Sequence, residues 1–70
     1  MTLGERLRAA REAKRWTQNK LSKISSIPSN SISLYENDKT DPSFFATMCL
    51  AKALGVSLDW LAGFKNKMEV

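Results

Sequence analysis

Hydrophobic residues recur along most of the chain at intervals of three and four positions, the spacing that places them on one face of an α-helix. Leu3, Leu7 and Ala10 begin this pattern, and Leu21 and Ile24 continue it. No segment alternates hydrophobic and polar residues as a half-buried β-strand does. The pattern therefore predicts an all-α fold of five short helices, over residues 3–14, 17–25, 28–36, 43–54 and 57–62.

Residues suited to helix ends lie at these boundaries. Serine and threonine hydroxyls can accept hydrogen bonds from the free N–H groups of a first helical turn, and three such residues begin predicted helices: Thr17, Ser43 and Ser57. Pro28 suits the first turn of the third helix, where its missing N–H costs nothing. Residues that accept the left-handed conformation of a helix end follow three of the helices: Asn37 with Asp38, Gly55 and Gly63.

The inward faces of these helices give the expected core. It comprises Leu7, Leu21, Ile24, Ile27, Ile32, Phe44, Met48, Ala51, Leu54, Val56, Trp60 and Leu61. The helix over residues 43–54 has almost no polar face, and a helix that is apolar all round is usually buried on every side. In a chain of 70 residues, a second subunit could instead cover one side of it.

The surplus apolar residues therefore predict a homodimer. Phe45 and Cys49, four positions apart, lie off the core stripe of their helix, and Leu58 and Phe64 could join them in the interface. The alternative is that Phe45 and Cys49 complete the core of a monomer.

Residues 17–36 read as a helix, a tight turn and a second helix within about twenty residues. The commonest unit of this size inserts its second helix into the major groove of DNA. Ile32 and Tyr35 point the same way as Ile27, so the opposite face of the second helix carries Ser29, Asn30, Ser33 and Leu34. Asparagine can pair with adenine and serine with several base edges. The alternative is a helix face that is polar because it is solvated.

Two segments, TQNKLSKISSIPSNSISLYENDKTDPS and ALGVSLDWLAG, resemble the Cro/CI-type (xenobiotic-response-element) family of phage and bacterial repressors. The resemblance covers about residues 3–63. It implies a lambda-repressor-like helix-turn-helix DNA-binding domain over residues 1–63, followed by a short tail over residues 64–70. The positions that match the base contacts of the family are Ser29, Asn30, Ser33 and Leu34. The expected contacts to the DNA backbone are Gln18, Lys20, Asn37, Lys39 and Thr40.

The resemblance also implies an ion pair, and the chain departs from the family at two positions. Arg11 and Glu36 match positions that form an ion pair in several members; the alternative is two exposed charges that never meet. The family usually has glycine at the position of Asp38. Many members have a long polar residue at the position of Leu34, which here would contact a thymine methyl group, face the DNA backbone or pack against the domain.

The charge distribution agrees with an anionic partner. The net charge is +4, but residues 1–23 carry seven lysines and arginines against two glutamates, a net charge of +5. A basic half on a small domain favours a polyanion. Charge alone would favour a solvated helix surface over a nucleic-acid partner, but the helix-turn-helix spacing favours nucleic acid. Arg8 and Lys23 are assigned no contact.

The composition argues against an enzyme. The chain has no histidine, no glycine-rich phosphate loop and no recognisable pair of acids, and the single Cys49 cannot form a zinc site or an internal disulfide. We therefore expect no cofactor, metal or small-molecule ligand. No apolar run approaches the roughly twenty residues of a membrane helix, and the charged N-terminus is no signal peptide, so we expect a cytoplasmic protein without a membrane partner.

Together these observations predict a transcriptional regulator, most simply a repressor, that binds specific double-stranded DNA. It would act as a homodimer on a palindromic operator with half-sites one helical turn apart. Two alternatives stay open. One is a protein-interaction module, such as an antitoxin or a small adaptor, on the same fold; the other is a DNA coater that binds every duplex equally.

Overall fold

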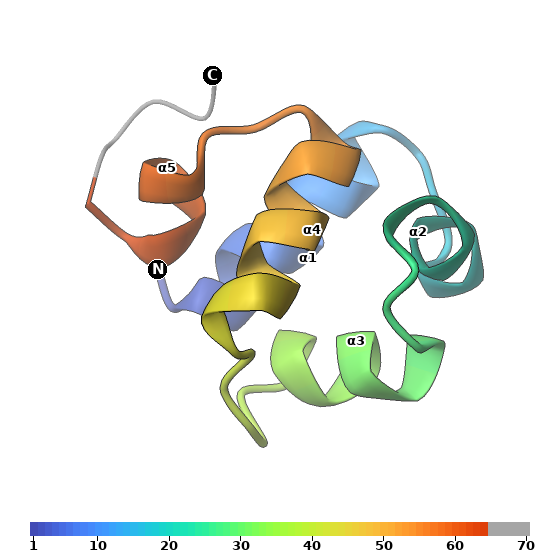
Figure 1. The fold of residues 1–70 in the computed structure, drawn as a ribbon, viewed down its shortest axis with the longest axis horizontal. Helices are drawn as coiled ribbons and strands as arrows, with labels where there is room; N and C mark the ends of the chain where they lie inside the picture. Colours follow the sequence, from blue (N-terminus) through green and yellow to red (C-terminus); the bar gives the residue numbers. More distant parts are fainter. Residues whose placement is uncertain (65–70) are drawn as a thin grey trace.

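The computed structural model of the chain describes residues 1–64, and this part is all-α, as predicted (Figure 1). Its five helices are α1 (Leu3–Ala13), α2 (Gln18–Ser25), α3 (Ser29–Glu36), α4 (Phe44–Leu54) and α5 (Leu58–Ala62). Each lies within one or two residues of its predicted bounds, the usual uncertainty of a helix end. The predicted tail, residues 64–70, lies outside the described residues except for Phe64.

The helices pack around α1 and α4, which cross in the middle of the molecule (Figure 1). The pair α2 and α3 lies to one side, with α2 against α4 and α3 against α1, and α5 closes the opposite side against α1 and α4. This arrangement leaves α3 at the edge of the molecule, where only one of its faces is covered.

The predicted caps are confirmed. The side-chain oxygens of Thr17, Ser43 and Ser57 each accept a hydrogen bond from the N–H group three residues on, at 3.1, 3.1 and 2.9 Å. Gly55 and Gly63 end their helices in the left-handed conformation. Pro28 precedes the first turn of α3 instead of lying within it.

α1 begins with a capping box that was not predicted. Thr2 Oγ1 accepts a hydrogen bond from the Glu5 N–H (3.1 Å), while Glu5 Oε1 accepts one from the Thr2 N–H (2.8 Å). The pattern of threonine followed three residues later by glutamate was the available signal. These two bonds fix the first turn of α1.

The core prediction was wrong for three residues. The side chains of Ile24, Phe44 and Met48 are 45, 71 and 43 % exposed. The fully buried side chains include Leu50, which was not predicted, and also Leu7, Leu21, Ile32, Leu54 and Leu61. In α4 the prediction chose the wrong face of the helix, because a different stripe of its residues packs against α1 and α2.

The buried stripe of α4 consists of Ala46, Thr47, Leu50, Ala51 and Leu54. The hydroxyl of Thr47 donates to the Ser43 carbonyl oxygen (2.8 Å), so its burial leaves no polar atom without a partner. The larger Phe44 and Met48 are left outside.

The start of α1 packs directly on the end of α3. Asp38 adopts a left-handed conformation (φ 56°), and its carboxylate accepts hydrogen bonds from Thr2 Oγ1 (2.8 Å) and the Gly4 N–H (3.2 Å). Gly4 is buried, and a Cβ atom there would lie 2.8 Å from the carbonyl oxygen of Glu36 and closer still to that of Tyr35. The two helices therefore touch through backbone atoms.

We expect Gly4→Ala to lower the free energy of unfolding by about 1–3 kcal/mol, because the added methyl group overlaps backbone atoms that cannot move independently. In an open helix interior the same exchange would raise stability by about 0.5–1 kcal/mol. Urea unfolding followed by circular dichroism measures the sign. Ala9→Gly, in the same helix, is the control and should cost about 1 kcal/mol. A Gly4→Ala variant as stable as the wild type would contradict the contact.

Candidate nucleic-acid interface

The turn between α2 and α3 is held by buried groups. Ser26 ends α2 in the left-handed conformation (φ 64°), and the buried hydroxyl of Ser25 accepts a hydrogen bond from the Ile27 N–H (3.2 Å). Leu21, Ile27 and Ile32 are buried on the inner sides of the two helices and the turn. These contacts give α3 one orientation relative to α2.

The outer face of α3 is open. Asn30 is exposed, Leu34 is 45 % exposed, and Ser29 and Ser33 are half-buried. Within residues 1–64, the side chain of Asn30 makes no hydrogen bond, so its amide is available to a ligand. Leu34 leaves nearly half of its surface open and does not complete the core. The predicted base-contacting residues are thus presented on a helix at the edge of the molecule.

A buried carboxylate fixes the far end of this helix. Glu36 is only 3 % exposed, yet it accepts hydrogen bonds from three residues of two other helices. Arg11 donates from Nε to Oε2 (2.7 Å) and from Nη2 to Oε1 (2.9 Å), which is the ion pair that the sequence analysis expected, in bidentate form. Gln18 Nε2 (3.1 Å) and Arg8 Nε (3.3 Å) also donate to Oε1.

Burial alone raises the pKa of Glu36, but the hydrogen bonds from Arg11 and Gln18 and the charge of Arg11 outweigh it and hold the pKa below its ordinary value. The hydrogen bond to Glu36 likewise raises the pKa of the Arg11 guanidinium. Both groups are therefore charged at neutral pH. Arg11 Nη1 also donates to the Trp16 carbonyl oxygen (2.7 Å), so one guanidinium ties α1 to both its connection with α2 and the end of α3.

The predicted backbone-contacting residues lie in two segments that the structure brings together. Gln18 and Lys20 lie in the first turn of α2, while the second segment follows α3 and comprises Asn37, Lys39 and Thr40, all exposed. The hydrogen bond from Gln18 to Glu36 joins the first segment to the last residue of α3, directly before the second segment. Gln18 thus braces the end of α3.

Arg8 was assigned no contact, but the structure shows two. Besides its bond to Glu36, Arg8 Nη2 donates to Asn37 Oδ1 at 3.2 Å. The partners are 28 and 29 residues away in the chain, so hydrophobic spacing and local charge gave no signal for this pair.

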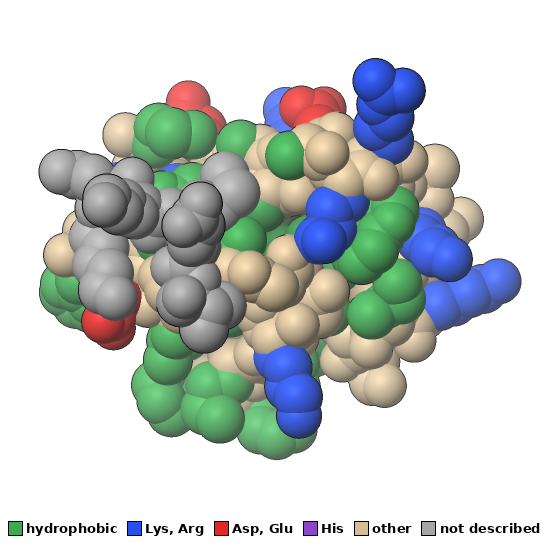
Figure 2. All heavy atoms as spheres, turned by 90° about the horizontal axis from the view of Figure 1, so that it is seen from above, with side chains coloured by type: hydrophobic (Ala, Val, Ile, Leu, Met, Phe, Trp, Pro, Cys, Tyr) green, Lys and Arg blue, Asp and Glu red, His purple; other side chains and the backbone are tan. Residues whose placement is uncertain are grey.

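The basic residues are concentrated in the first third of the chain. Figure 2 shows lysine and arginine side chains gathered mostly toward one end of the visible face, and carboxylates mainly elsewhere. This agrees with the net charge of +5 on residues 1–23, which form α1, most of α2 and their connection. The net charge of these residues favours a polyanion as partner, although the face drawn in Figure 2 is the one away from α3.

The residues predicted for dimerisation lie in different places on α4 and α5. Phe45 is 70 % and Phe64 84 % exposed, while Cys49 and Leu58 are half-buried and pack against the core. Leu58 and Phe64 line a shallow groove with Phe44, which was expected in the core, whereas Cys49 lines another groove. The alternative that Phe45 and Cys49 complete a monomer core does not fit the exposure of Phe45, but it agrees with the position of Cys49.

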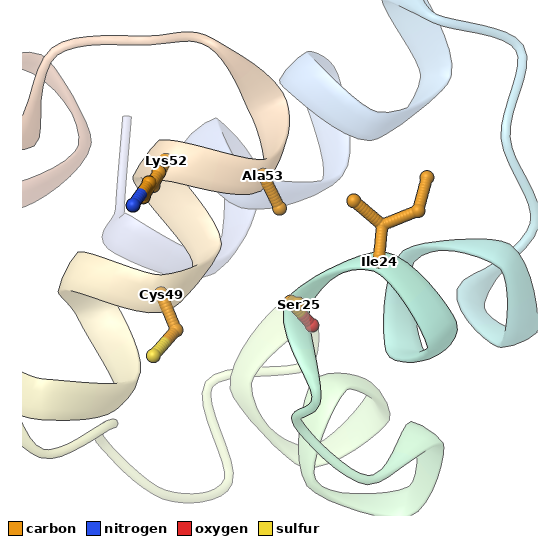
Figure 3. Close-up of a pocket in the computed structure, with 5 residues that line it drawn as sticks. All are labelled: Ile24, Ser25, Cys49, Lys52 and Ala53. Carbon is orange, nitrogen blue, oxygen red and sulfur yellow. The ribbon is translucent and has the colours of Figure 1, made fainter.

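A second groove of about 400 Å³ lies between α2 and α4 (Figure 3). Ile24 lies on its α2 side and Cys49 and Ala53 on its α4 side, with Ser25 and Lys52 completing the lining.

Residues 1–64 contain no cluster of three or more histidine, cysteine, aspartate or glutamate side chains that could hold a metal ion. In the same range, no helix has the length and apolar character needed to cross a membrane.

Comparison with known proteins gives three results. A model of the helix-turn-helix family matches residues 7–61. The HTH-type transcriptional regulator ImmR of Bacillus subtilis (strain 168) is 36 % identical over 63 residues, or 90 % of the chain, which spans about half of that relative's length. Among solved structures, the P22 c2 repressor in complex with a synthetic operator is 32 % identical, with a TM-score of 0.86 over 93 % of this chain and 98 % of that one.

The SinR protein in its complex with SinI shares the fold, with a TM-score of 0.85 at 21 % identity over 93 % of this chain and 64 % of that one.

Proposed function

Because the chain belongs to the helix-turn-helix family of the Cro/CI type, we propose that it is a transcriptional regulator that binds specific double-stranded DNA. The main support for this proposal is that α3 is held firmly by the rest of the fold and leaves its outer face open. Its outer face presents Asn30 and Leu34 to solvent, while the buried Glu36 fixes its end to α1 and α2. A helix that is rigidly held and open on one side can enter a major groove without rearrangement.

In this proposal α3 reads base edges. The amide of Asn30 pairs with the N6 and N7 atoms of an adenine, and the hydroxyls of Ser29 and Ser33 bond to neighbouring bases. Leu34 contacts a thymine methyl group, because a leucine side chain offers no hydrogen bond. These contacts provide sequence preference.

The two segments on either side of α3 bind the DNA backbone. The first turn of α2 offers Gln18, Lys20 and free N–H groups at the positive end of a helix dipole. The loop after α3 offers Asn37, Lys39 and Thr40. Such contacts give affinity without sequence information and make binding depend on salt.

The test is to select bound sequences from a random pool of duplex DNA and to measure affinity for the selected sequence against competitor DNA. Enrichment of one sequence, with affinity at least about 10³-fold above that for random DNA, supports the proposal. Equal affinity for all duplexes would indicate a DNA coater instead. Absence of binding even at low salt would favour the protein-interaction module.

The proposal extends to a homodimer on a palindromic operator, which would act as a repressor by occupying a promoter. A two-fold contact cannot use α2 and α3, which face the DNA in this proposal. The exposed Phe44, Phe45 and Phe64 and the half-buried Leu58 offer apolar surface outside these two helices, whereas Cys49 lies in the groove between α2 and α4 and could contribute only at its edge. Two-fold symmetry would place the two α3 helices about 34 Å apart, one turn of B-DNA. An apolar surface of this kind suits a small interface, below about 1,200 Å² in total.

We expect Phe45→Lys to weaken self-association, because it places a charge in the centre of the proposed apolar contact. Sedimentation equilibrium should show a wild-type monomer–dimer equilibrium that the variant shifts to monomer. Affinity for a palindrome should fall, while affinity for a single half-site stays close to that of the wild type. Ala13→Lys adds the same charge to the exposed end of α1 and should leave association unchanged. A wild type that stays monomeric at high concentration and binds one half-site would overturn the dimer.

A further inference from the structure

Asn37 is exposed, yet both ends of its carboxamide are already bonded within the protein. Nδ2 donates to the Ser33 carbonyl oxygen (2.9 Å), and Oδ1 accepts from Arg8 Nη2 (3.2 Å). A carbonyl cannot donate and a guanidinium cannot accept, so only this orientation of the amide satisfies both partners. One N–H of Nδ2 is left over, and its direction is set by the other two bonds.

Arg8 can set this orientation because its guanidinium is itself fixed. Nε donates to the buried Glu36 Oε1 (3.3 Å), while Nη2 donates to Asn37 Oδ1. The planar guanidinium thus bonds to two consecutive residues, the last residue of α3 and the C-cap that follows it. The side chain of Arg8 is 44 % exposed and that of Glu36 is 0 % exposed. The anchor is therefore buried, and the bonded amide lies at the surface.

The residue after Asn37 is held as well. The carboxylate of Asp38 accepts hydrogen bonds from Thr2 and Gly4 at the start of α1. The beginning of the loop that carries Lys39 and Thr40 is thus attached to α1 at two consecutive residues, once through Arg8 and once through Asp38. A segment held in this way loses little freedom when it binds a ligand.

We propose that Arg8 is a positioning residue for DNA binding, which orients the Asn37 amide so that its remaining N–H donates to a phosphate oxygen. This inference rests on the proposed function. Arg8 acts through Asn37 and not by contacting DNA. The competing explanation is that the partly exposed guanidinium of Arg8 binds a phosphate directly.

Charge-conserving and charge-removing variants separate the two explanations. Lysine keeps the positive charge but has no planar fork that can hold Glu36 and Asn37 together, and methionine has neither. We expect Arg8→Lys and Arg8→Met to weaken binding to the selected duplex to a similar extent, about 3- to 10-fold. The slope of log affinity against log salt should stay unchanged, because a neutral amide releases no counterion.

The coupling to Asn37 is tested in the same assay. Asn37→Ala should cause a similar loss, and adding Arg8→Lys to that variant should cause no further loss. The side-chain amide protons of Asn37, followed by NMR on the free protein, should exchange with solvent faster in Arg8→Lys than in the wild type. Thermal unfolding of each variant verifies that affinities are compared between folded proteins.

Several results would overturn the inference. Arg8→Lys with wild-type affinity, together with a salt slope lowered by about 0.9 in Arg8→Met, would assign Arg8 to a direct phosphate contact. A further loss when Arg8→Lys is combined with Asn37→Ala would show that Arg8 acts independently of Asn37. In both cases the wild type still binds DNA and the proposed function stands. A wild type that binds no DNA would refute the function itself.

Discussion

Glu36→Ala is expected to lower the free energy of unfolding by about 3–5 kcal/mol, the range found when one partner of a buried ion pair is removed. The reason is that the variant leaves the largely buried guanidinium of Arg11 without its carboxylate partner. Its side chain is only 12 % exposed, so the guanidinium would lose two charge-assisted hydrogen bonds without gaining full solvation. Gln18 and Arg8 would lose their acceptor too.

A domain of this size is stable by only a few kcal/mol, so the variant should be largely unfolded at room temperature. Circular dichroism with urea titration measures the effect. Glu12→Ala removes an exposed carboxylate from α1 and should change stability by less than about 0.5 kcal/mol. A Glu36→Ala variant within about 1 kcal/mol of the wild type would show that the pair contributes no more than a surface ion pair.

The same carboxylate makes stability depend on pH. Folding lowers the pKa of Glu36 below its ordinary value of 4.5, so the folded state favours the charged form. The resulting stabilisation is fully present above pH 4.5 and is lost as the pH falls through the folded pKa. Glu36→Gln cannot titrate at this position, so the difference in unfolding free energy between it and the wild type should stay constant above pH 4.5 and narrow as the pH falls below that value. A difference that stays constant below pH 4.5 as well would contradict the assignment.

Asn30→Ala is expected to weaken binding to the selected DNA sequence by about 1–3 kcal/mol and to relax preference at one base pair. Asn30 is exposed and bonds to nothing else among residues 1–64, so the stability of the fold should not change. Competition binding against duplexes with each base substituted in turn measures the loss of preference.

Lys39→Ala is the matched control for Asn30→Ala. It removes an exposed charge from the loop after α3, so it should weaken binding to every sequence alike and lower the salt slope by about one unit. Equal loss on selected and random DNA for Asn30→Ala would mean that this residue touches only the phosphate backbone.

Local chemistry made the positions of the helices predictable. A hydroxyl before each of α2, α4 and α5 accepts a hydrogen bond from the first turn, and glycine ends α4 and α5. Such interactions join residues three or four apart, so a single chain contains all the information they need. The capping box of Thr2 and Glu5 depends on the same kind of short-range pattern, although it was not predicted.

The candidate site was predictable where a motif of the family carries it. The spacing between Thr17 and Glu36 located the helix pair and its outer face, and the match of Arg11 and Glu36 to paired positions anticipated the ion pair. Arg8 matched no such motif. Arg8 can bond to Glu36 and Asn37 only because α1 packs on the end of α3, and these two segments are distant in the chain.

The sequence by itself determined that residues 1–64 form five helices, where these helices begin and end, and which helix face is polar, because all of these depend on neighbours within about four residues. Only the tertiary structure decided which side of α4 is buried. That helix is apolar on nearly every face, so the spacing of its hydrophobic residues does not indicate which face is buried. Packing against α1, α2 and α5 buries Leu50 and leaves Phe44 and Met48 exposed. Packing also brought Arg8 to Asn37, since no local rule connects residues 29 positions apart.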